Sequence, residues 1–235
     1  MDLYNNKDLF HFLSAYMQTN TRIKEVVIWD ILNQCLDALV YLHNKDLIHR
    51  DIKLSNIFMN DTGKIVIGDF GHCAIMKNEN LIKYTQNPED QEILRFYCLP
   101  EVGSPGFQAP EIFSGFYDQK VDVYSLGVCM YCLCFQVLPP QDNCQTITND
   151  NHYSYELKSI IEQMLKKDPN ERPNSSDLYQ IYKQKLLINM SLIQIFILLY
   201  NVILIIKIVT NIFRIHLKSI IYLIPLIKKK LLWLY

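Results

Sequence analysis

The sequence predicts an α+β fold that is mainly helical and contains a small β element. Two long stretches predict helices: residues 23–43 have apolar side chains at the spacing of one helix face, and residues 121–138 are almost all apolar. Two short apolar runs, 57–59 and 64–67, predict a pair of strands. The turn residues Asp61-Thr62-Gly63 lie between these runs and predict the connection. Helices therefore supply most of the expected core, and one hairpin supplies the β element.

The predicted helices are supported by different sequence patterns. In residues 23–43 the apolar positions are Val27, Ile28, Ile31, Leu32, Cys35, Leu36, Leu39 and Leu42. We expect this helix to support the loop that follows it, and we expect His43 in its last turn to be a packed structural residue rather than a catalytic one. Residues 153–166 predict an amphipathic helix, and a final helix is predicted over about 175–187.

The composition predicts one sizeable core and an appendage. The chain has 235 residues, of which 50% are hydrophobic, and a formal net charge of −1. A nearly neutral chain gives no reason to expect a nucleic-acid partner. Its seven cysteines are scattered without paired spacing, which predicts free thiols in a reducing compartment, and hence a cytoplasmic protein.

Three of these cysteines, Cys129, Cys132 and Cys134, lie close together in the sequence. One interpretation of this spacing is a metal site. The other is that the three side chains are packed as small apolar groups in the helix predicted over 121–138. The apolar sequence around them favours the second interpretation.

Five short motifs follow one another along the chain. They are His49-Arg50-Asp51-Ile52-Lys53-Leu54-Ser55-Asn56, Gly68-Asp69-Phe70-Gly71, Ala109-Pro110-Glu111, Asp122-Val123-Tyr124-Ser125-Leu126-Gly127 and Asp168-Pro169-Asn170-Glu171-Arg172-Pro173. In this order they resemble the C-terminal lobe (C-lobe) of eukaryotic protein kinases, over about residues 1–187. Within that superfamily the chain is similar to the NIMA-related (Nek) serine/threonine kinases. That likeness lies in Ser55-Asn56-Ile57-Phe58, in Ile67-Gly68-Asp69-Phe70-Gly71 and in residues 152–159.

The resemblance implies a phosphoryl-transfer site that uses ATP and Mg²⁺ as cofactors. Asp51 would accept or orient the proton of the attacking hydroxyl, and Lys53 would reach the transferring phosphoryl group. Asn56 and Asp69 would ligate Mg²⁺ through hard oxygen atoms. Phe58 would lie beneath the adenine ring.

The resemblance also implies supporting roles near these residues. His49 would stack on Phe70, the middle residue of the Asp69-Phe70-Gly71 element. Asp122 would hold the backbone around His49 and Arg50. The alternative is that Asp122 is a plain N-cap of its helix, and the two roles are compatible.

Four further side chains, all after residue 100, have candidate roles. Ser104 matches the hydroxyl that bridges the catalytic Asp and Lys in serine/threonine kinases, and it implies a Ser/Thr acceptor in a protein substrate rather than Tyr. Glu111 and Arg172 are expected to form a buried or half-buried pair. Glu101 is a candidate partner for Arg50 in place of a phosphate, and the alternative is an exposed, solvated side chain.

The implied function is that of a serine/threonine protein kinase, which moves the γ-phosphoryl group of Mg-ATP to a protein hydroxyl. Residues 1–10 resemble the hinge between kinase lobes, and residues 1–48 contain no candidate for the Gly-rich phosphate loop or for the Lys and Glu of the N-terminal lobe (N-lobe). We therefore expect a partial kinase domain over residues 1–187, with the N-lobe absent. The competing interpretations are a non-catalytic, pseudokinase-like binding module and a gene-model fragment. The sequence does not indicate an oligomeric state.

Residues 188–235 are a hydrophobic tail rich in Ile, Leu and Lys, which is expected to be helical. Residues 186–206 contain no charged side chain, and this stretch is long enough to span a bilayer. One interpretation is a transmembrane helix that anchors a cytoplasmic lobe to a membrane. The other is low-complexity sequence without a folded role, such as readthrough of A/T-rich DNA.

Overall fold

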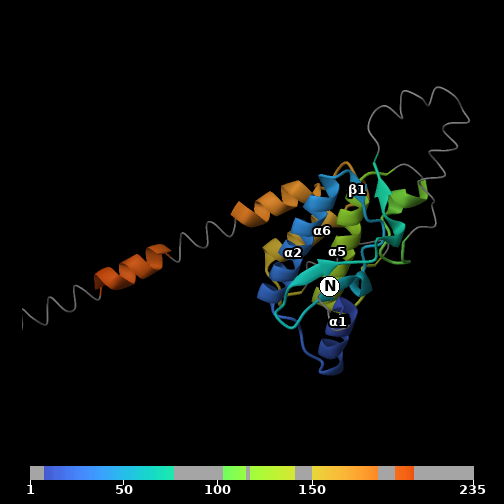
Figure 1. Cartoon of the computed structure of the whole chain (residues 1–235). Coiled ribbons are helices and arrows are strands. Elements are labelled where there is room, and N and C mark those ends of the chain that lie inside the picture. The colour runs from blue at the N-terminus through green and yellow to red at the C-terminus, as the bar shows by residue number, and fades with distance from the viewer. Residues whose placement is uncertain (1–7, 77–102, 115–116, 141–149, 185–193, 204–235) are drawn as a thin grey trace, which may run out of the picture. The chain divides into compact units, whose positions relative to one another are not determined.

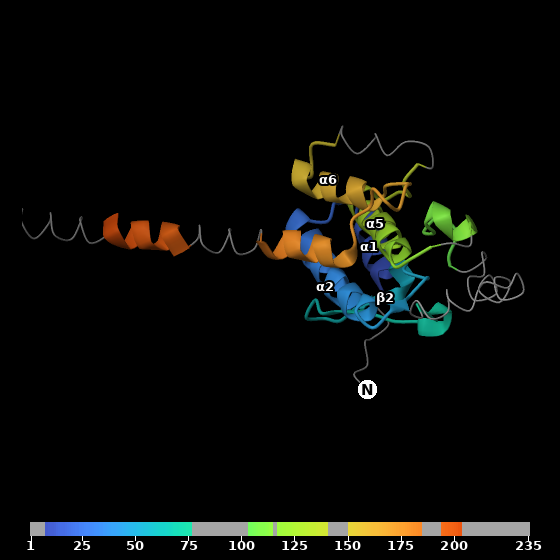
Figure 2. The same ribbon diagram turned by 90° about the horizontal axis from the view of Figure 1, so that it is seen from above.

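The computed structural model describes residues 8–76, 103–114, 117–140, 150–184 and 194–203. In this part of the chain the fold is mainly helical, with four short strands. The helices α1 (Leu9–Gln18), α2 (Glu25–His43), α5 (Lys120–Phe135) and α6 (Tyr155–Met164) are followed by a helix over residues 175–184. Figures 1 and 2 show these helices gathered into one body, with the strands along one side.

Helix α5 forms the centre of the core. It is buried on all sides, which is how a helix that is apolar all round avoids water in a globular protein. Its packing against α6 is close at Gly127, where a Cβ atom would lie 2.8 Å from the Cβ of Met164. The helix ends at Phe135 rather than at the predicted residue 138, because Gln136 adopts a left-handed conformation with φ 62°.

Helix α2 packs its apolar side into the same core. The eight positions predicted to form that side are buried except Val27, which packs partly buried against the core. By length and composition alone α2 would also qualify as a membrane span, and no other helix of the described ranges does. Its burial against α5 and the strands β1 and β3 explains its apolar character without a membrane.

The cysteines of α5 are packed thiols, as the apolar sequence around them predicted. Cys129, Cys132 and Cys134 are free and buried, and so is Cys35 of α2. Burial raises the pKa of Cys35 and of Cys132 to about 12, so these thiols stay protonated. No group of three or more His, Cys, Asp or Glu side chains could hold a metal ion in the described ranges, so the metal-site interpretation is wrong.

The strands form two antiparallel pairs. Strand β2 (Ile57–Met59) pairs with β3 (Ile65–Ile67), and this is the predicted hairpin. In its turn the side-chain oxygen of Asn60 accepts hydrogen bonds from the backbone N–H of Thr62 and of Lys64, at 3.0 and 2.8 Å. The second pair, β1 (Leu47–Ile48) with β4 (Ala74–Ile75), was not predicted. It links the residues just before the predicted catalytic loop, which is the motif over residues 49–56, to those just after Gly71.

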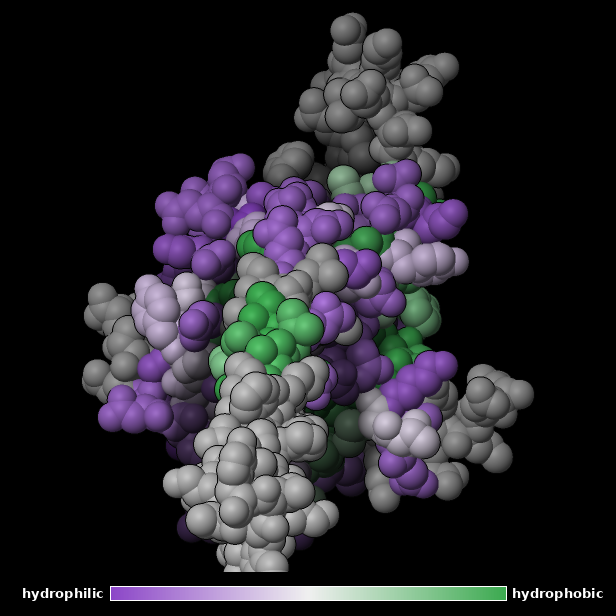
Figure 3. Space-filling model, turned by 90° about the vertical axis from the view of Figure 1, so that its left-hand side faces the viewer, coloured by the Kyte–Doolittle hydropathy of each residue, from purple (hydrophilic) through white to green (hydrophobic). Residues whose placement is uncertain are grey.

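The helix over residues 175–184 packs against α2. Asn174 caps it, since its side-chain oxygen accepts the backbone N–H of Asp177 at 2.8 Å. Tyr182 near its end stacks on Trp29 of α2, with ring centroids 5.7 Å apart. Residues 185–187 of the predicted helix lie outside the described residues. Hydrophilic side chains cover much of the outer surface of the protein in the view of Figure 3.

The chain divides into two units, residues 1–182 and 183–235. The second unit contains the described helix Gln194–Ile203, whose apolar side chains are exposed. The described part of this helix has 10 residues, and a bilayer span needs about 20. The rest of the predicted span 186–206 lies outside the described residues.

Candidate active site

The predicted catalytic loop places Asp51 in a network of side-chain hydrogen bonds. One carboxylate oxygen, Oδ2, accepts from Nζ of Lys53 at 2.8 Å and from Nδ2 of Asn56 at 3.0 Å. The other, Oδ1, accepts from the Ser104 hydroxyl at 3.0 Å. Only 4% of Asp51 is exposed. The carboxylate is therefore fixed in orientation by three side chains, one of which lies 53 residues away in the sequence.

The same contacts set the charge of Asp51. Burial alone would raise its pKa, but hydrogen bonds from Lys53 and Ser104, the positive charge of Lys53 and a hydrogen bond from Asn56 outweigh that effect. The pKa of Asp51 consequently lies below its ordinary value. The group is ionised at neutral pH, and as a carboxylate it can only accept hydrogen bonds.

Ser104 closes a triangle with Asp51 and Lys53. Nζ of Lys53 donates to the Ser104 hydroxyl at 2.7 Å, and that hydroxyl in turn donates to Asp51. The preceding residue, Gly103, makes this approach feasible. Its φ is 107°, and a Cβ atom there would lie 2.9 Å from the carbonyl oxygen of Arg50. The predicted bridge between the Asp and the Lys is thus present in the geometry.

The two predicted metal ligands differ in how they are held. Asn56 is buried in a single 3₁₀ turn (η1, Leu54–Asn56), and its Nδ2 donates to both the backbone and the side chain of Asp51. Both amide protons are used in these bonds, so the amide oxygen is the atom that would coordinate a metal. Asp69 is exposed, and its Oδ1 accepts the backbone N–H of Gly71 at 3.4 Å. A carboxylate and an amide oxygen suit Mg²⁺, which usually takes one or two protein ligands and completes its shell with water and phosphate.

His49 ties the catalytic loop to the residues around Asp69. Its ring is fully buried, and Nε2 lies 3.0 Å from the carbonyl oxygen of Gly68. That acceptor requires Nε2 to carry the proton, which leaves Nδ1 free to accept the backbone N–H of Asp51 at 3.3 Å. The ring also contacts Phe70, with centroids 5.0 Å apart and planes tilted by 58°. The predicted contact is present, although the rings are tilted rather than stacked.

Asp122 holds the backbone at the start of the catalytic loop. Its Oδ2 accepts the backbone N–H of His49, and its Oδ1 accepts that of Arg50, both at 2.8 Å. Arg50 has a φ of 67°, a conformation that side chains other than Gly adopt at a cost, and these bonds help to hold it. The N-cap of α5 is Gln119, and Asp122 lies in the first turn. The interpretation of Asp122 as an N-cap is therefore wrong.

The Arg50 side chain has partners that the sequence did not indicate. Its Nε donates to the carbonyl oxygen of His72 at 2.5 Å, and its Nη1 donates to the hydroxyl of Tyr117 at 3.1 Å. Tyr117 stands five residues before Asp122, so both bind Arg50 from the same short segment. No motif marks Tyr117. The one sequence feature that could have indicated its contact with Arg50 is its position shortly before Asp122. Glu101, the predicted partner, lies outside the described residues.

Glu111 and Arg172 form the predicted pair. Two parallel hydrogen bonds join them: Nη1 of Arg172 to Oε1 of Glu111, and Nη2 to Oε2 at 3.2 Å. Arg172 is 1% exposed, and it also donates to the carbonyl oxygen of Lys166 and lies over the ring of Tyr124, 4.9 Å from its centroid. The pair joins the 3₁₀ helix η3 (Pro110–Ser114), which follows the Ser104 segment, to the chain beyond α6.

Phe58 lies in β2 and is half-buried. A Cβ atom on Gly68 would lie 2.9 Å from its ring, so the absence of a side chain at Gly68 lets the ring pack there. Residue 58 also forms a β-bridge with Asp8, at the start of α1. This places the predicted adenine-binding side chain beside the Gly68–Gly71 element.

The chain is similar in sequence to known proteins. A sequence model of the family described as "Protein kinase domain" matches residues 1–184. The chain is 31% identical over 173 residues to "Serine/threonine-protein kinase TAO2" of Xenopus laevis, an alignment that covers 66% of this chain and 15% of the relative. It is 29% identical over 192 residues to "Serine/threonine-protein kinase Nek1" of Mus musculus, covering 77% of this chain and 14% of the relative.

A shorter relative is covered more fully. The chain is 30% identical over 194 residues to "Probable serine/threonine-protein kinase nek2" of Dictyostelium discoideum, which covers 76% of this chain and 42% of the relative. The chain therefore spans less than half the length of each of these three relatives.

Proposed function

This chain belongs to the protein kinase domain family, and we propose that its reaction is transfer of the γ-phosphoryl group of Mg-ATP to a serine or threonine hydroxyl of a protein substrate. The observation that carries the proposal is the triangle of Asp51, Lys53 and Ser104. It holds a carboxylate ready to accept a proton beside an ammonium group ready to meet phosphate charge. Relatives named serine/threonine-protein kinases, TAO2 and Nek1, support the same reaction class.

Positioning and charge are what phosphoryl transfer chiefly needs from a protein. Asp51 would orient the attacking hydroxyl and accept its proton. Lys53 already donates to Asp51, and its ammonium group would stabilise the negative charge of the transferring phosphoryl group. Mg²⁺, when bound through Asn56 and Asp69, would neutralise charge on the phosphates of ATP.

The choice of Ser/Thr rather than Tyr as acceptor rests on Ser104. Its hydroxyl accepts a hydrogen bond from Lys53 and donates one to Asp51. Ser104 thus puts a small polar group beside the carboxylate that would receive a short aliphatic hydroxyl. This part of the proposal relies on resemblance to serine/threonine kinases as well as on the contact.

We infer that nucleotide binding also requires an N-lobe to cover the phosphates. Residues 1–48 carry no Gly-rich loop and no Lys placed to hold the α- and β-phosphates. The alternative function is a non-catalytic module that binds a partner. The enzyme is favoured because Asp51, Lys53, Asn56 and Asp69 are all present and three of them are joined in one network.

The test is a phosphotransfer assay with labelled ATP and a generic basic protein substrate. Residues 1–235 are assayed alone and after fusion behind the N-lobe of a Nek kinase. We expect labelled phosphoserine or phosphothreonine from the fusion, dependent on Mg²⁺ and lost in Asp51→Asn and in Asp69→Asn. Turnover at about 1–100 per second by residues 1–235 alone would overturn the requirement for an N-lobe. A folded fusion that binds Mg-ATP but transfers no phosphate would overturn the kinase proposal.

A further inference from the structure

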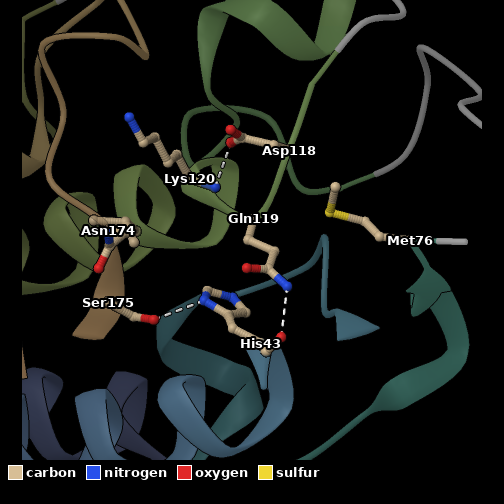
Figure 4. Close-up of a pocket in the computed structure, with 8 residues that line it drawn as sticks. His43, Met76, Asp118, Gln119, Lys120, Asn174 and Ser175 are labelled. Carbon is tan, nitrogen blue, oxygen red and sulfur yellow. Dashed lines mark hydrogen bonds between the residues drawn. The ribbon is translucent and has the colours of Figure 1, made fainter. Parts of the chain in front are cut away.

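A cavity of about 270 Å³ lies between the end of α2, the start of α5 and the start of the helix over residues 175–184. Figure 4 shows the ring of His43 in its wall, with Gln119 on one side and Ser175 on the other. Gln119 fixes the backbone here, since its Nε2 donates to the carbonyl oxygen of His43 at 2.7 Å. His43 and Ser175 are both buried, at 7% and 2% exposure.

Both ring nitrogens of His43 have partners. Nδ1 lies 2.8 Å from the hydroxyl oxygen of Ser175, and Nε2 lies 3.0 Å from Oδ2 of Asp122. A carboxylate can only accept, so Nε2 must carry a proton. In the neutral ring Nδ1 is then the acceptor, and the Ser175 hydroxyl is the group that donates to it. The hydrogen bonds thus run in one direction, from Ser175 through His43 to Asp122.

The end of this sequence of bonds is the catalytic loop. The same oxygen, Oδ2 of Asp122, also accepts the backbone N–H of His49, while Oδ1 accepts that of Arg50. A carboxylate can rotate about its bond to Cβ, and the N–H of His43 is the additional contact that fixes Oδ2 toward His49. The orientation of Asp122 therefore depends on which nitrogen of His43 carries the proton.

We propose that His43 and Ser175 are positioning residues for the catalytic loop: the Ser175 hydroxyl holds His43 in its Nε2–H tautomer, and that N–H orients Asp122 toward the backbone of His49 and Arg50. The importance of this loop for phosphoryl transfer rests on the proposed function. The tautomer and its effect on the loop do not.

The loss of the Ser175 hydroxyl should be measurable in the loop. A buried acceptor left unpaired typically costs enough to change a local equilibrium by about tenfold. In Ser175→Ala we therefore expect the amide protons of His49 and Arg50 to exchange with solvent about tenfold faster. Ser175→Thr keeps a hydroxyl and should restore most of the protection. Ser176→Ala removes the neighbouring hydroxyl and is the matched control, expected to leave exchange unchanged.

The experiment combines two measurements on the full chain. Imidazole ¹⁵N NMR, at a pH where the ring is neutral, reads the tautomer of His43, which is assigned by the loss of its signals in His43→Gln. Hydrogen exchange then reads the His49 and Arg50 amides in the three serine variants. The expected result is a protonated Nε2 and an unprotonated Nδ1 in the parent, with faster loop exchange in Ser175→Ala alone.

Two results would overturn the proposal. One is a proton on Nδ1 of His43 in the parent protein, a measurement that needs no variant to fold. The other is unchanged exchange of both loop amides in a folded Ser175→Ala variant. Neither measurement depends on phosphoryl transfer, so failure here is distinct from failure of the proposed function.

Discussion

The two predicted halves of the active site, the acceptor side at Asp51 and the metal side at Asp69, are built differently. Asp51 is buried, and side chains from two separate segments hold both of its oxygens. Asp69 is exposed and its backbone is left-handed, with φ 62°, and its Oδ1 accepts the backbone N–H of Gly71 over a long distance, 3.4 Å. The acceptor side is ordered by the chain's own hydrogen bonds, whereas the metal side presents its carboxylate to solvent.

The cost of burying charge explains this difference. A buried carboxylate without partners is very unfavourable, so Asp51 can be buried only because Lys53, Ser104 and Asn56 pair with it. A carboxylate that is to bind a cation must keep its oxygens available. Asp69 does so by remaining exposed. We therefore expect the two carboxylates to respond differently to substitution.

The largest expected effect is on turnover. In the N-lobe fusion described above, Asp51→Ala should lower kcat by about 10²–10⁴-fold, the usual contribution of a positioned proton acceptor. Its nucleotide affinity should change little, whereas Asp69→Ala should abolish Mg²⁺-dependent nucleotide binding. Steady-state kinetics and nucleotide titration separate the two. Asp37→Ala, at an exposed position of α2, is the control, and an Asp51→Ala enzyme with most of its turnover would show that the proton acceptor is misassigned.

The next effect is on stability. On the acceptor side, the chain that carries Ser104 continues into η3, where Glu111 pairs with Arg172. Arg172→Ala removes the guanidinium that pairs with the Glu111 carboxylate, a side chain that is only 9% exposed, and we expect the free energy of unfolding to fall by about 3–5 kcal/mol. Lys166→Ala breaks an exposed pair with Glu171 at 3.6 Å and should cost less than about 1 kcal/mol. Urea unfolding measures both. Equal effects would mean that the buried pair contributes no more than a surface one.

A third prediction compares the stability effects of changing two carboxylates: Asp122, which binds the backbone next to Asp51, and Asp69 of the metal side. In Asp122→Asn one oxygen becomes an amide N–H₂ group, which cannot accept the backbone N–H of His49 or of Arg50. A buried donor left unpaired costs about 1–3 kcal/mol. Asp69→Asn changes an exposed group and should stay within about 0.5 kcal/mol of the parent. If Asp69→Asn were the more destabilising in urea unfolding, the contrast between the two sides would be wrong.

The sequence predicted best where a motif keeps its partners close. Asp51, Lys53 and Asn56 fall within six residues, so a single loop can bring their side chains into contact. The two long helices were also predictable, because α2 buries one periodic face and α5 is apolar all round. Their ends were less so, since the stop after Phe135 depends on the backbone of Gln136.

Contacts between distant segments without a motif were not predictable. Ser175 meets His43 across 132 residues, and Tyr117 meets Arg50 across 67. A serine or tyrosine carries no sign of its partner, because its hydroxyl can bind almost any polar group. The pairing of β1 with β4 was missed for a related reason. Two-residue strands are too short to show alternation of apolar and polar side chains.

The smallest expected effect is a change in the pKa of Asp51 when a contact on the acceptor side is removed. Burial raises this pKa, and Lys53, Ser104 and Asn56 together lower it further than burial raises it. Ser104→Ala removes one lowering contact, so the pKa of Asp51 should rise. Lys53→Met removes a hydrogen bond and a positive charge together, so the rise there should be larger. Titration of the Asp51 carboxyl by ¹³C NMR measures both, with Ser176→Ala as the control.

The sign of the effect on stability follows from the direction of the shift. Because the pKa of Asp51 is lower in the folded chain than in the unfolded one, its contribution to stability is present above the unfolded pKa and is lost as pH falls through the folded value. In Ser104→Ala the two pKa values lie closer together, so acidification should remove less stability through this residue than in the parent. An unchanged or lower pKa in Ser104→Ala would show that the hydroxyl does not hold the charge of Asp51. The acceptor side would then be ordered by Lys53 and Asn56 alone.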